Sequence, residues 1–191
     1  MPSAGKAVIG LSLFLSSFPG LAPLRAQPVN ADAQRVLRII EKIEKEGSPG
    51  PGAASRKEVV SETELNAYLA YRIASEKEEI MKELRLKLLS RNRIEGKIFI
   101  DLSGRRIPGF LKPQMNVYFA GTLETEGPKV RIRMESLFLE EQRIQTALLD
   151  MIISVVSQFE KTEAVSIEDW YDLPYGILRL EARLGELIVF Y

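Results

Sequence analysis

The sequence predicts an α+β fold in which a curved antiparallel sheet of about three hairpins wraps around an apolar helix, with two N-terminal amphipathic helices before it. Three observations predict this fold. Apolar residues recur every three or four positions in two early segments, alternate with polar residues in three later pairs of segments, and fill most of one late segment. A period of 3.6 is typical of a half-buried helix, and a period of two is typical of a strand with one wet face. Gly96 and Gly121 interrupt the alternating segments and indicate bends or close backbone contacts, hence a strongly curved sheet.

The first 26 residues have the order of a secretory signal peptide. Lys6 precedes the apolar run 7–18, a Pro-Gly pair interrupts it, and small residues lead to Ala26. This order matches the charged, apolar and small-residue regions of a cleavable leader. We expect cleavage after Ala26 and a periplasmic or secreted protein. An uncleaved N-terminal anchor is the less favoured alternative, because the prolines and the glycine make a poor membrane-spanning helix.

The composition excludes several classes of function. Removing residues 1–26 takes Lys6 and Arg25 from the 26 basic residues and leaves all 26 acidic residues, which gives a net charge of −2. A dedicated nucleic-acid-binding protein normally has a concentrated basic surface, so we expect no nucleic-acid partner. The sequence has no cysteine and no histidine, which excludes disulfides, thiol nucleophiles, Ser-His-Asp triads and zinc-histidine sites. We therefore predict a non-catalytic protein that needs no metal or cofactor.

Residues 27–47 predict the first amphipathic helix. Asn30 is a good N-cap for a helix over 31–46, and Gly47 stands where glycine often ends a helix. The Pro- and Gly-rich stretch that follows predicts a flexible linker over 48–56.

Residues 57–191 predict a single α+β domain, because their length suits one hydrophobic core. Its helix begins at Ser61, since Ser61 and Glu64 have the spacing of a capping box and an apolar stripe from Leu65 to Ile73 follows.

Three hairpins are expected in this domain. The first turns at Arg91-Asn92, the second at Glu126-Gly127 and the last at Leu184-Gly185. Strict alternation places the following residues of the second hairpin on its apolar face: Met115, Val117, Phe119, Gly121, Leu123, Val130, Ile132, Met134, Ser136 and Phe138.

Residues 145–161 predict the most apolar helix. Leaving most of its nine apolar residues in water would cost on the order of 10–20 kcal/mol, so other parts of the chain must cover it. Two interpretations stay open: the sheet and a second helix fill the surrounding space, or the sheet and this helix enclose a groove that an acyl chain completes. For the groove, the candidate ligand-binding residues are Met115, Val117, Phe119, Met134, Leu148, Met151, Ile152 and Val155.

The loop over 104–113 is a candidate membrane-contact site. It places Arg105, Arg106 and Lys112 around bulky apolar residues that include Phe110. Cations beside apolar groups suit transient contact with an anionic membrane, where each cation adds about 1 kcal/mol. The alternative is a solvated connection whose apolar residues fold back onto the core.

A family resemblance rests on two phrases and on the order of the elements. Ser61-Glu-Thr-Glu-Leu-Asn-Ala-Tyr-Leu69 opens a helix, and Leu173-Pro-Tyr-Gly-Ile177 precedes the closing hairpin. In this arrangement residues 57–191 resemble small bacterial envelope proteins that are similar to the tubular lipid-binding superfamily, typified by bactericidal/permeability-increasing protein. The resemblance implies a curved sheet rolled around a long helix, here 145–161, with a lipid in the apolar seam between them.

The leading functional hypothesis is an exported envelope protein that binds a lipid or other apolar ligand. The alternative is a non-catalytic interaction or assembly module of the cell envelope with a filled core. In that alternative the contact is made either by the apolar terminal residues 187–191, as a sheet edge that pairs with a strand of an envelope protein, or by the aromatic turn at Trp170.

Overall fold

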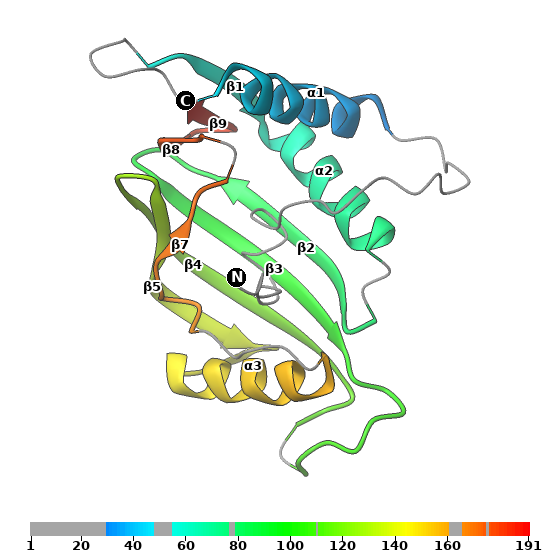
Figure 1. Ribbon diagram of the computed structural model, residues 1–191. Helices are drawn as coiled ribbons and strands as arrows, with labels where there is room; N and C mark the ends of the chain where they lie inside the picture. The colour runs from blue at the N-terminus through cyan, green and yellow to red at the C-terminus, as the bar shows by residue number, and fades with distance from the viewer. Residues whose placement is uncertain (1–29, 48–54, 77–78, 110, 161–165, 175) are drawn as a thin grey trace, which may run out of the picture.

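The computed structural model describes residues 30–47, 55–76, 79–109, 111–160, 166–174 and 176–191. These described residues form an α+β architecture with a strongly curled antiparallel sheet and three helices (Figure 1). The predicted leader 1–26 lies outside the described residues, as does most of the predicted linker. The larger sheet has the order β2-β3-β4-β5-β6, with β7 paired to β5: β2 (Met81–Leu88), β3 (Arg93–Asp101), β4 (Gln114–Glu126), β5 (Lys129–Leu139), β6 (Gln142–Arg143) and β7 (Tyr171–Asp172).

The hairpins expected from alternation are present. β2 and β3 pair around Arg91 and Asn92, and β4 and β5 pair with Glu126 opposite Lys129. The last hairpin joins β8 (Arg179–Arg183) to β9 (Glu186–Phe190). Residues on the concave side of the larger sheet are buried, among them Ile98, Val117 and Ile132. The alternation of apolar and polar residues therefore predicted the positions of these strands correctly.

The expected alternation is wrong in the last part of β5. Gly121 pairs with Met134 but Ala120 pairs with Ser136, so Glu135 is an extra residue in a β-bulge. Beyond the bulge Leu137, 3% exposed, takes the inward position that alternation gave to Ser136 and Phe138. A single inserted residue moves the side chain of every following residue of the strand to the opposite face of the sheet.

Two inward glycines allow the sheet to curl tightly. A Cβ on Gly96 would lie 2.1 Å from the ring of Phe119, which is its direct partner on β4. A Cβ on Gly121 would lie 2.6 Å from the backbone oxygen of Arg133, next to the bulge. Both glycines therefore permit the close approach that the sequence indicated.

β9 is not a sheet edge, so the expectation for residues 187–191 is wrong. β9 lies between β8 and β1 (Lys57–Ser61) in a three-stranded sheet, and both of its hydrogen-bonding sides are occupied. Tyr191 is 1% exposed and exchanges two backbone hydrogen bonds with Arg56. The partner strand β1 was not predicted, because five residues with one buried side chain give almost no periodic signal.

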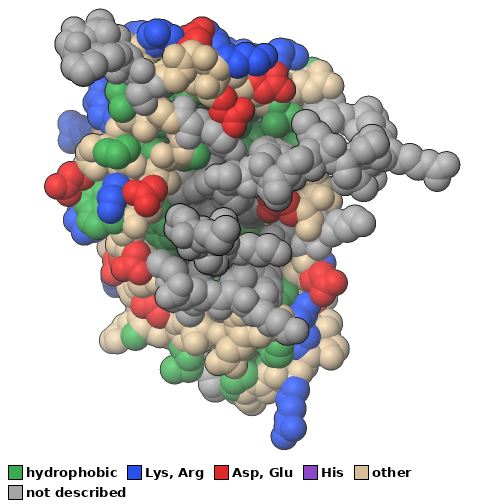
Figure 2. Space-filling view, viewed as in Figure 1, with side chains coloured by type: hydrophobic (Ala, Val, Ile, Leu, Met, Phe, Trp, Pro, Cys, Tyr) green, Lys and Arg blue, Asp and Glu red, His purple; other side chains and the backbone are tan. Residues whose placement is uncertain are grey.

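Two helices cover one end of the curled sheet. α1 (Ala31–Glu46) begins at the N-cap Asn30 and ends at Gly47, whose φ is 64°. α2 (Glu62–Ser75) begins with the capping box of Ser61 and Glu64. The exposed face of α1 carries interspersed basic and acidic side chains along the top of the molecule (Figure 2). Its buried face joins the same hydrophobic core as the sheet.

α2 also closes the free edge of β2. The side-chain amide of Asn66 donates to the Leu86 carbonyl at 2.7 Å, and its oxygen accepts from the Leu86 amide at 2.8 Å. The Glu62 carboxylate accepts from the Leu88 amide at 2.7 Å. These side chains stand in for a neighbouring strand and leave fewer unpaired backbone groups on the edge.

α3 (Thr146–Glu160) lies across the opposite end of the sheet from α1 and α2 (Figure 1). Leu149, Ile152 and Val156 are buried, whereas Met151 is 48% exposed. The expectation that the sheet wraps around this helix is not confirmed. Within the described residues, no helix combines the length and apolarity that a membrane crossing requires.

Candidate functional site: an apolar cavity

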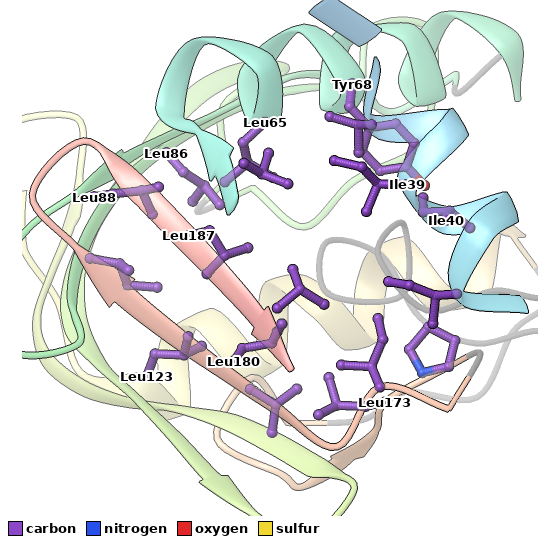
Figure 3. Close-up of a pocket in the computed structure, with 18 of the residues that line it drawn as sticks. Ile39, Ile40, Leu65, Tyr68, Leu86, Leu88, Leu123, Leu173, Leu180 and Leu187 are labelled. Carbon is purple, nitrogen blue, oxygen red and sulfur yellow. The ribbon is translucent and has the colours of Figure 1, made fainter. Parts of the chain in front are cut away.

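A cavity of about 90 Å³ lies between α1, α2, the curled sheet and the β8–β9 hairpin. Figure 3 shows side chains from all of these elements pointing toward one space, with Leu65 and Tyr68 on the α2 side and Ile39 and Ile40 on the α1 side. The described residues that line it number nineteen: Val36, Ile39, Ile40, Ile43, Val60, Leu65, Tyr68, Leu86, Leu88, Ile94, Leu123, Val130, Ile132, Leu173, Pro174, Ile177, Leu180, Leu187 and Val189.

The α1 wall follows from the helical period. Val36, Ile39, Ile40 and Ile43 are spaced by three, one and three residues, so they share one face of the helix. The opposite wall follows from the pleat, because Leu86, Leu88, Ile94, Leu123, Val130 and Ile132 all occupy inward positions of β2 to β5.

The segment before β8 closes the remaining side. Leu173, Pro174 and Ile177 belong to it, and Leu173 is held there by its amide, which donates to the Pro128 carbonyl at 2.6 Å. This segment carries one of the two phrases on which the family resemblance rests, although the sequence did not indicate that it would border a cavity.

Among the lining residues that the structure describes, Tyr68 is the one whose side chain has a polar atom. Its hydroxyl accepts a hydrogen bond of 3.0 Å from the guanidinium of Arg72, which is only 3% exposed and also pairs with Glu76. Burial raises the pKa of the Tyr68 hydroxyl, and the adjacent guanidinium opposes that rise. The hydroxyl therefore stays protonated at neutral pH and can donate a hydrogen bond.

Ion pairs hold α1 over the cavity. Arg35 pairs with Glu64 at 2.5 Å, and Lys42 pairs with Glu58 at 2.5 Å. Glu46 pairs with Arg56 and accepts a hydrogen bond of 3.2 Å from the Tyr191 hydroxyl.

These contacts shift the ionisation of the groups involved. The hydrogen bond from Arg56 lowers the pKa of Glu46, and the hydrogen bond to Glu58 raises the pKa of Lys42. Burial alone would raise the pKa of Glu64, but hydrogen bonds from Ser61 and Arg35 outweigh it and lower the pKa. All three groups are therefore charged at neutral pH, and the ion pairs are intact there.

None of the eight residues proposed for a groove beside the apolar helix lines this cavity. Met115, Val117, Phe119 and Ile152 are buried, each at most 5% exposed. Met134, Leu148 and Val155 are half-buried, and Met151 is exposed. The sequence singled them out through the apolarity of 145–161, whereas the cavity depends on how α1 and α2 fit the curled sheet at the other end.

The structure shows partners for one residue of the proposed membrane-contact loop. Arg105 pairs with Glu79 at 2.8 Å and stacks on the ring of Phe159, 5.2 Å from its centroid. Arg106 and Lys112 are exposed, and Phe110 lies outside the described residues. The neighbouring Leu111 is buried and belongs to the core.

The residues that the structure describes offer few other candidate binding or catalytic groups. No group of three or more Asp, Glu, His or Cys residues there could hold a metal ion. The one buried side-chain polar atom without a hydrogen-bond partner in that part of the chain is the hydroxyl of Ser157 on α3.

Comparisons with known proteins assign no family to this chain. No protein-family model matches the chain, and no curated protein matches it either. The function therefore has to be inferred from the cavity and its walls.

Proposed function

We propose that this chain is an exported envelope protein that binds a lipid or other apolar molecule and seats the apolar end of that ligand in the cavity under α1. The observation that supports this proposal is the lining, in which eighteen of the nineteen residues that the structure describes are aliphatic and the remaining one is Tyr68. A void of this composition favours hydrocarbon over water, because water needs two to four polar partners. The leader pattern and the resemblance to envelope lipid-binding proteins point in the same direction.

The size of the cavity limits what enters without rearrangement. About 90 Å³ is below the roughly 300–1,000 Å³ of typical ligand pockets and below the roughly 150 Å³ of an engineered cavity that binds benzene. The end of an acyl chain fits, and each methylene that leaves water contributes about 0.8 kcal/mol. A longer segment requires one wall to move.

α1 is the wall best suited to move. It is held partly by ion pairs whose cationic side chains are 44–47% exposed, and such pairs are typically worth about 0.2–1 kcal/mol each. The sheet walls are fixed by continuous backbone hydrogen bonds instead. An outward shift of α1 would widen the cavity, and its main cost would be the exposure of Val36, Ile39 and Ile43, which are each at most 8% exposed.

A groove between the curled sheet and α3 would be the second candidate seat for the ligand. It would use the eight residues inferred from sequence, with Met151 already exposed. Exposed Arg106 and Lys112 would add transient contact with an anionic membrane during ligand exchange, at about 1 kcal/mol per cation.

Filling the cavity tests the proposal directly. Val36, Val60 and Val130 line it, and replacing all three with isoleucine adds three methylenes to the void. We expect the triple variant to be at least as stable as the wild type and to bind fluorescent fatty acid more weakly by about tenfold or more, since each displaced methylene is worth about 0.8 kcal/mol.

The control replaces Val156, a buried valine outside the lining and outside the eight residues inferred for the α3 groove, with isoleucine. Equal affinities for the control and the triple variant would contradict the proposed seat. Native mass spectrometry of the purified protein, before and after lipid extraction, reports whether any apolar ligand is carried at all. A protein without adducts and without affinity for fatty acids or phospholipids would remove the proposed function. The intact mass of protein from the envelope fraction would show whether residues 1–26 are removed.

A further inference from the structure

A second hollow lies on the outer side of β8, and none of its described lining residues lines the apolar cavity. It has a volume of about 370 Å³ and forms where the β2–β3 turn meets β8. Successive residues of β8 point to opposite faces, so Leu180 lines the apolar cavity while Arg179 and Glu181 line this hollow. Its lining is Ser90, Arg91, Asn92, Arg179, Glu181, Ala182 and Arg183.

The two sides of the hollow are clamped together by two hydrogen bonds between Asn92 and Ala182. The Asn92 amide donates to the Ala182 carbonyl at 3.1 Å, and the Ala182 amide donates to Asn92 Oδ1 at 2.9 Å. Arg91 and Asn92 both have positive φ, at 62° and 58°. A two-residue turn of this kind normally takes Asn-Gly, so an arginine here is placed against local backbone preference. The clamp nevertheless keeps Arg91 beside the arginines of β8.

Positive charge exceeds negative charge in the hollow. Glu181 pairs with Arg183 at 2.8 Å and with Arg179 at 3.5 Å, so one carboxylate serves two guanidinium groups. Arg91 has no ion-pair partner among the residues that the structure describes, and it is exposed. Three arginines and one glutamate give the lining a formal charge of +2.

Arg179 is held in place independently of any ligand. Its guanidinium lies 3.8 Å from the centre of the Phe190 ring, and its side chain is still 52% exposed. A stacked, partly exposed guanidinium loses little rotamer freedom on binding and keeps donors directed to solvent.

We propose that this hollow binds a phosphate group, carried either by a small soluble molecule or by a phospholipid head. A phosphate monoester has a charge of about −1.5 to −2 near pH 7, which matches the surplus of +2, and three oxygens that accept from separate guanidinium groups. A single carboxylate carries half that charge and is already provided by Glu181. The volume leaves room for the group that bears the phosphate.

The test uses the purified full chain with two probes. Isothermal titration with inorganic phosphate and pyrophosphate measures binding of the free anion. Co-sedimentation with phosphatidylcholine vesicles, with and without phosphatidic acid, whose head is a phosphate monoester, measures binding of the lipid head.

Three variants make the test specific. Arg91→Asn removes one guanidinium and introduces a residue that tolerates positive φ, so the turn should fold at least as well. Arg183→Gln removes a second guanidinium. Arg85→Gln is the matched control, because it removes the same charge from an outward position of β2 where Arg85 pairs with Glu83 at 2.7 Å.

We expect Arg91→Asn and Arg183→Gln each to weaken binding of at least one probe by about fivefold or more, as for the loss of one charge-assisted contact. Arg85→Gln should bind like the wild type. An effect on phosphate and pyrophosphate identifies a soluble phosphate ligand, and an effect on anionic vesicles alone identifies a lipid head. The proposal is overturned if neither probe binds, or if Arg85→Gln weakens binding as much as Arg91→Asn does. A thermal melt of each variant confirms that it is folded.

Discussion

α1 and α3 occupy opposite ends of the same curled sheet, yet their roles are the reverse of what their compositions suggest. α3 is the more apolar helix, but none of its residues lines the cavity. α1 has a charged outer face and contributes four lining residues. The apolarity of a helix reports how much surface it must bury. Whether a void remains depends on how well the buried faces fit each other.

The largest effect should come from deleting residues 187–191, which form the central strand of the sheet beside the α1 end. Leu187, Ile188, Val189 and Tyr191 are each at most 6% exposed, so about 6–12 kcal/mol of burial is lost, comparable to the whole stability of a domain. We expect loss of the cooperative unfolding transition in circular dichroism. A folded truncated protein with a melting temperature near that of the wild type would show that β9 is dispensable.

Alanine substitution at matched sites in the two helices tests the comparison itself. Ile43 of α1 and Ile152 of α3 are both 1% exposed, so each change to alanine should cost about 2–5 kcal/mol in urea unfolding. Ile43→Ala enlarges the cavity and should raise affinity for a small apolar probe, measured as added stability in its presence. Ile152→Ala should leave that affinity unchanged. The opposite pattern of affinities would move the ligand site to α3.

The glycines between the two ends test what sets the curl of the sheet. Gly121→Ala brings a methyl group against the backbone of Arg133, and Gly96→Ala brings one against the Phe119 ring. Both changes should destabilise the protein by about 1–3 kcal/mol, as overpacking does. Gly121→Ala should cost more, because a ring can rotate away and a backbone oxygen cannot. Thermal unfolding of both variants ranks them, and equal costs would argue against this view of the two contacts.

Acid should loosen α1 before α3. The folded-state pKa values of Glu46 and Glu64 are lowered, so their contribution to stability is present above the ordinary glutamate value near 4.5 and is lost as the pH falls through the folded values. No ion pair of the described residues involves α3. Hydrogen exchange at pH 7 and pH 3.5, corrected for intrinsic rates, should show a larger loss of protection in α1. Equal losses in both helices would mean that the ion pairs do not hold α1.

The smallest effect on stability is expected for Met151→Gln on α3. Met151 is 48% exposed, so the free energy of unfolding should change by no more than about 0.5 kcal/mol. Fatty-acid affinity should also stay unchanged if the ligand sits under α1. A clear loss of affinity with unchanged stability would favour the groove beside α3.

Local signals in the sequence were enough for most of the elements. Asn30, the Ser61 capping box and the alternating residues mark helices and strands whose hydrogen bonds are formed between near neighbours, and the structure places α1, α2 and the three hairpins at those positions. The bulge at Glu135 was not predicted, because one inserted residue is hard to detect in a segment that stays rich in apolar residues.

Contacts between distant segments were decided only by the tertiary structure. Because β1 pairs with β9, the expected edge strand is the central strand of its sheet. Residues of α1 line the same cavity as Leu173 and Leu180, which are far from them in the sequence. The basic hollow likewise needs the Arg91 turn and β8 side by side. Sequence periodicity specifies which face of an element is apolar. Periodicity does not specify which other element will cover that apolar face. The covering element depends on sheet curvature, strand register and side-chain volume together, and these are fixed only when the whole chain packs.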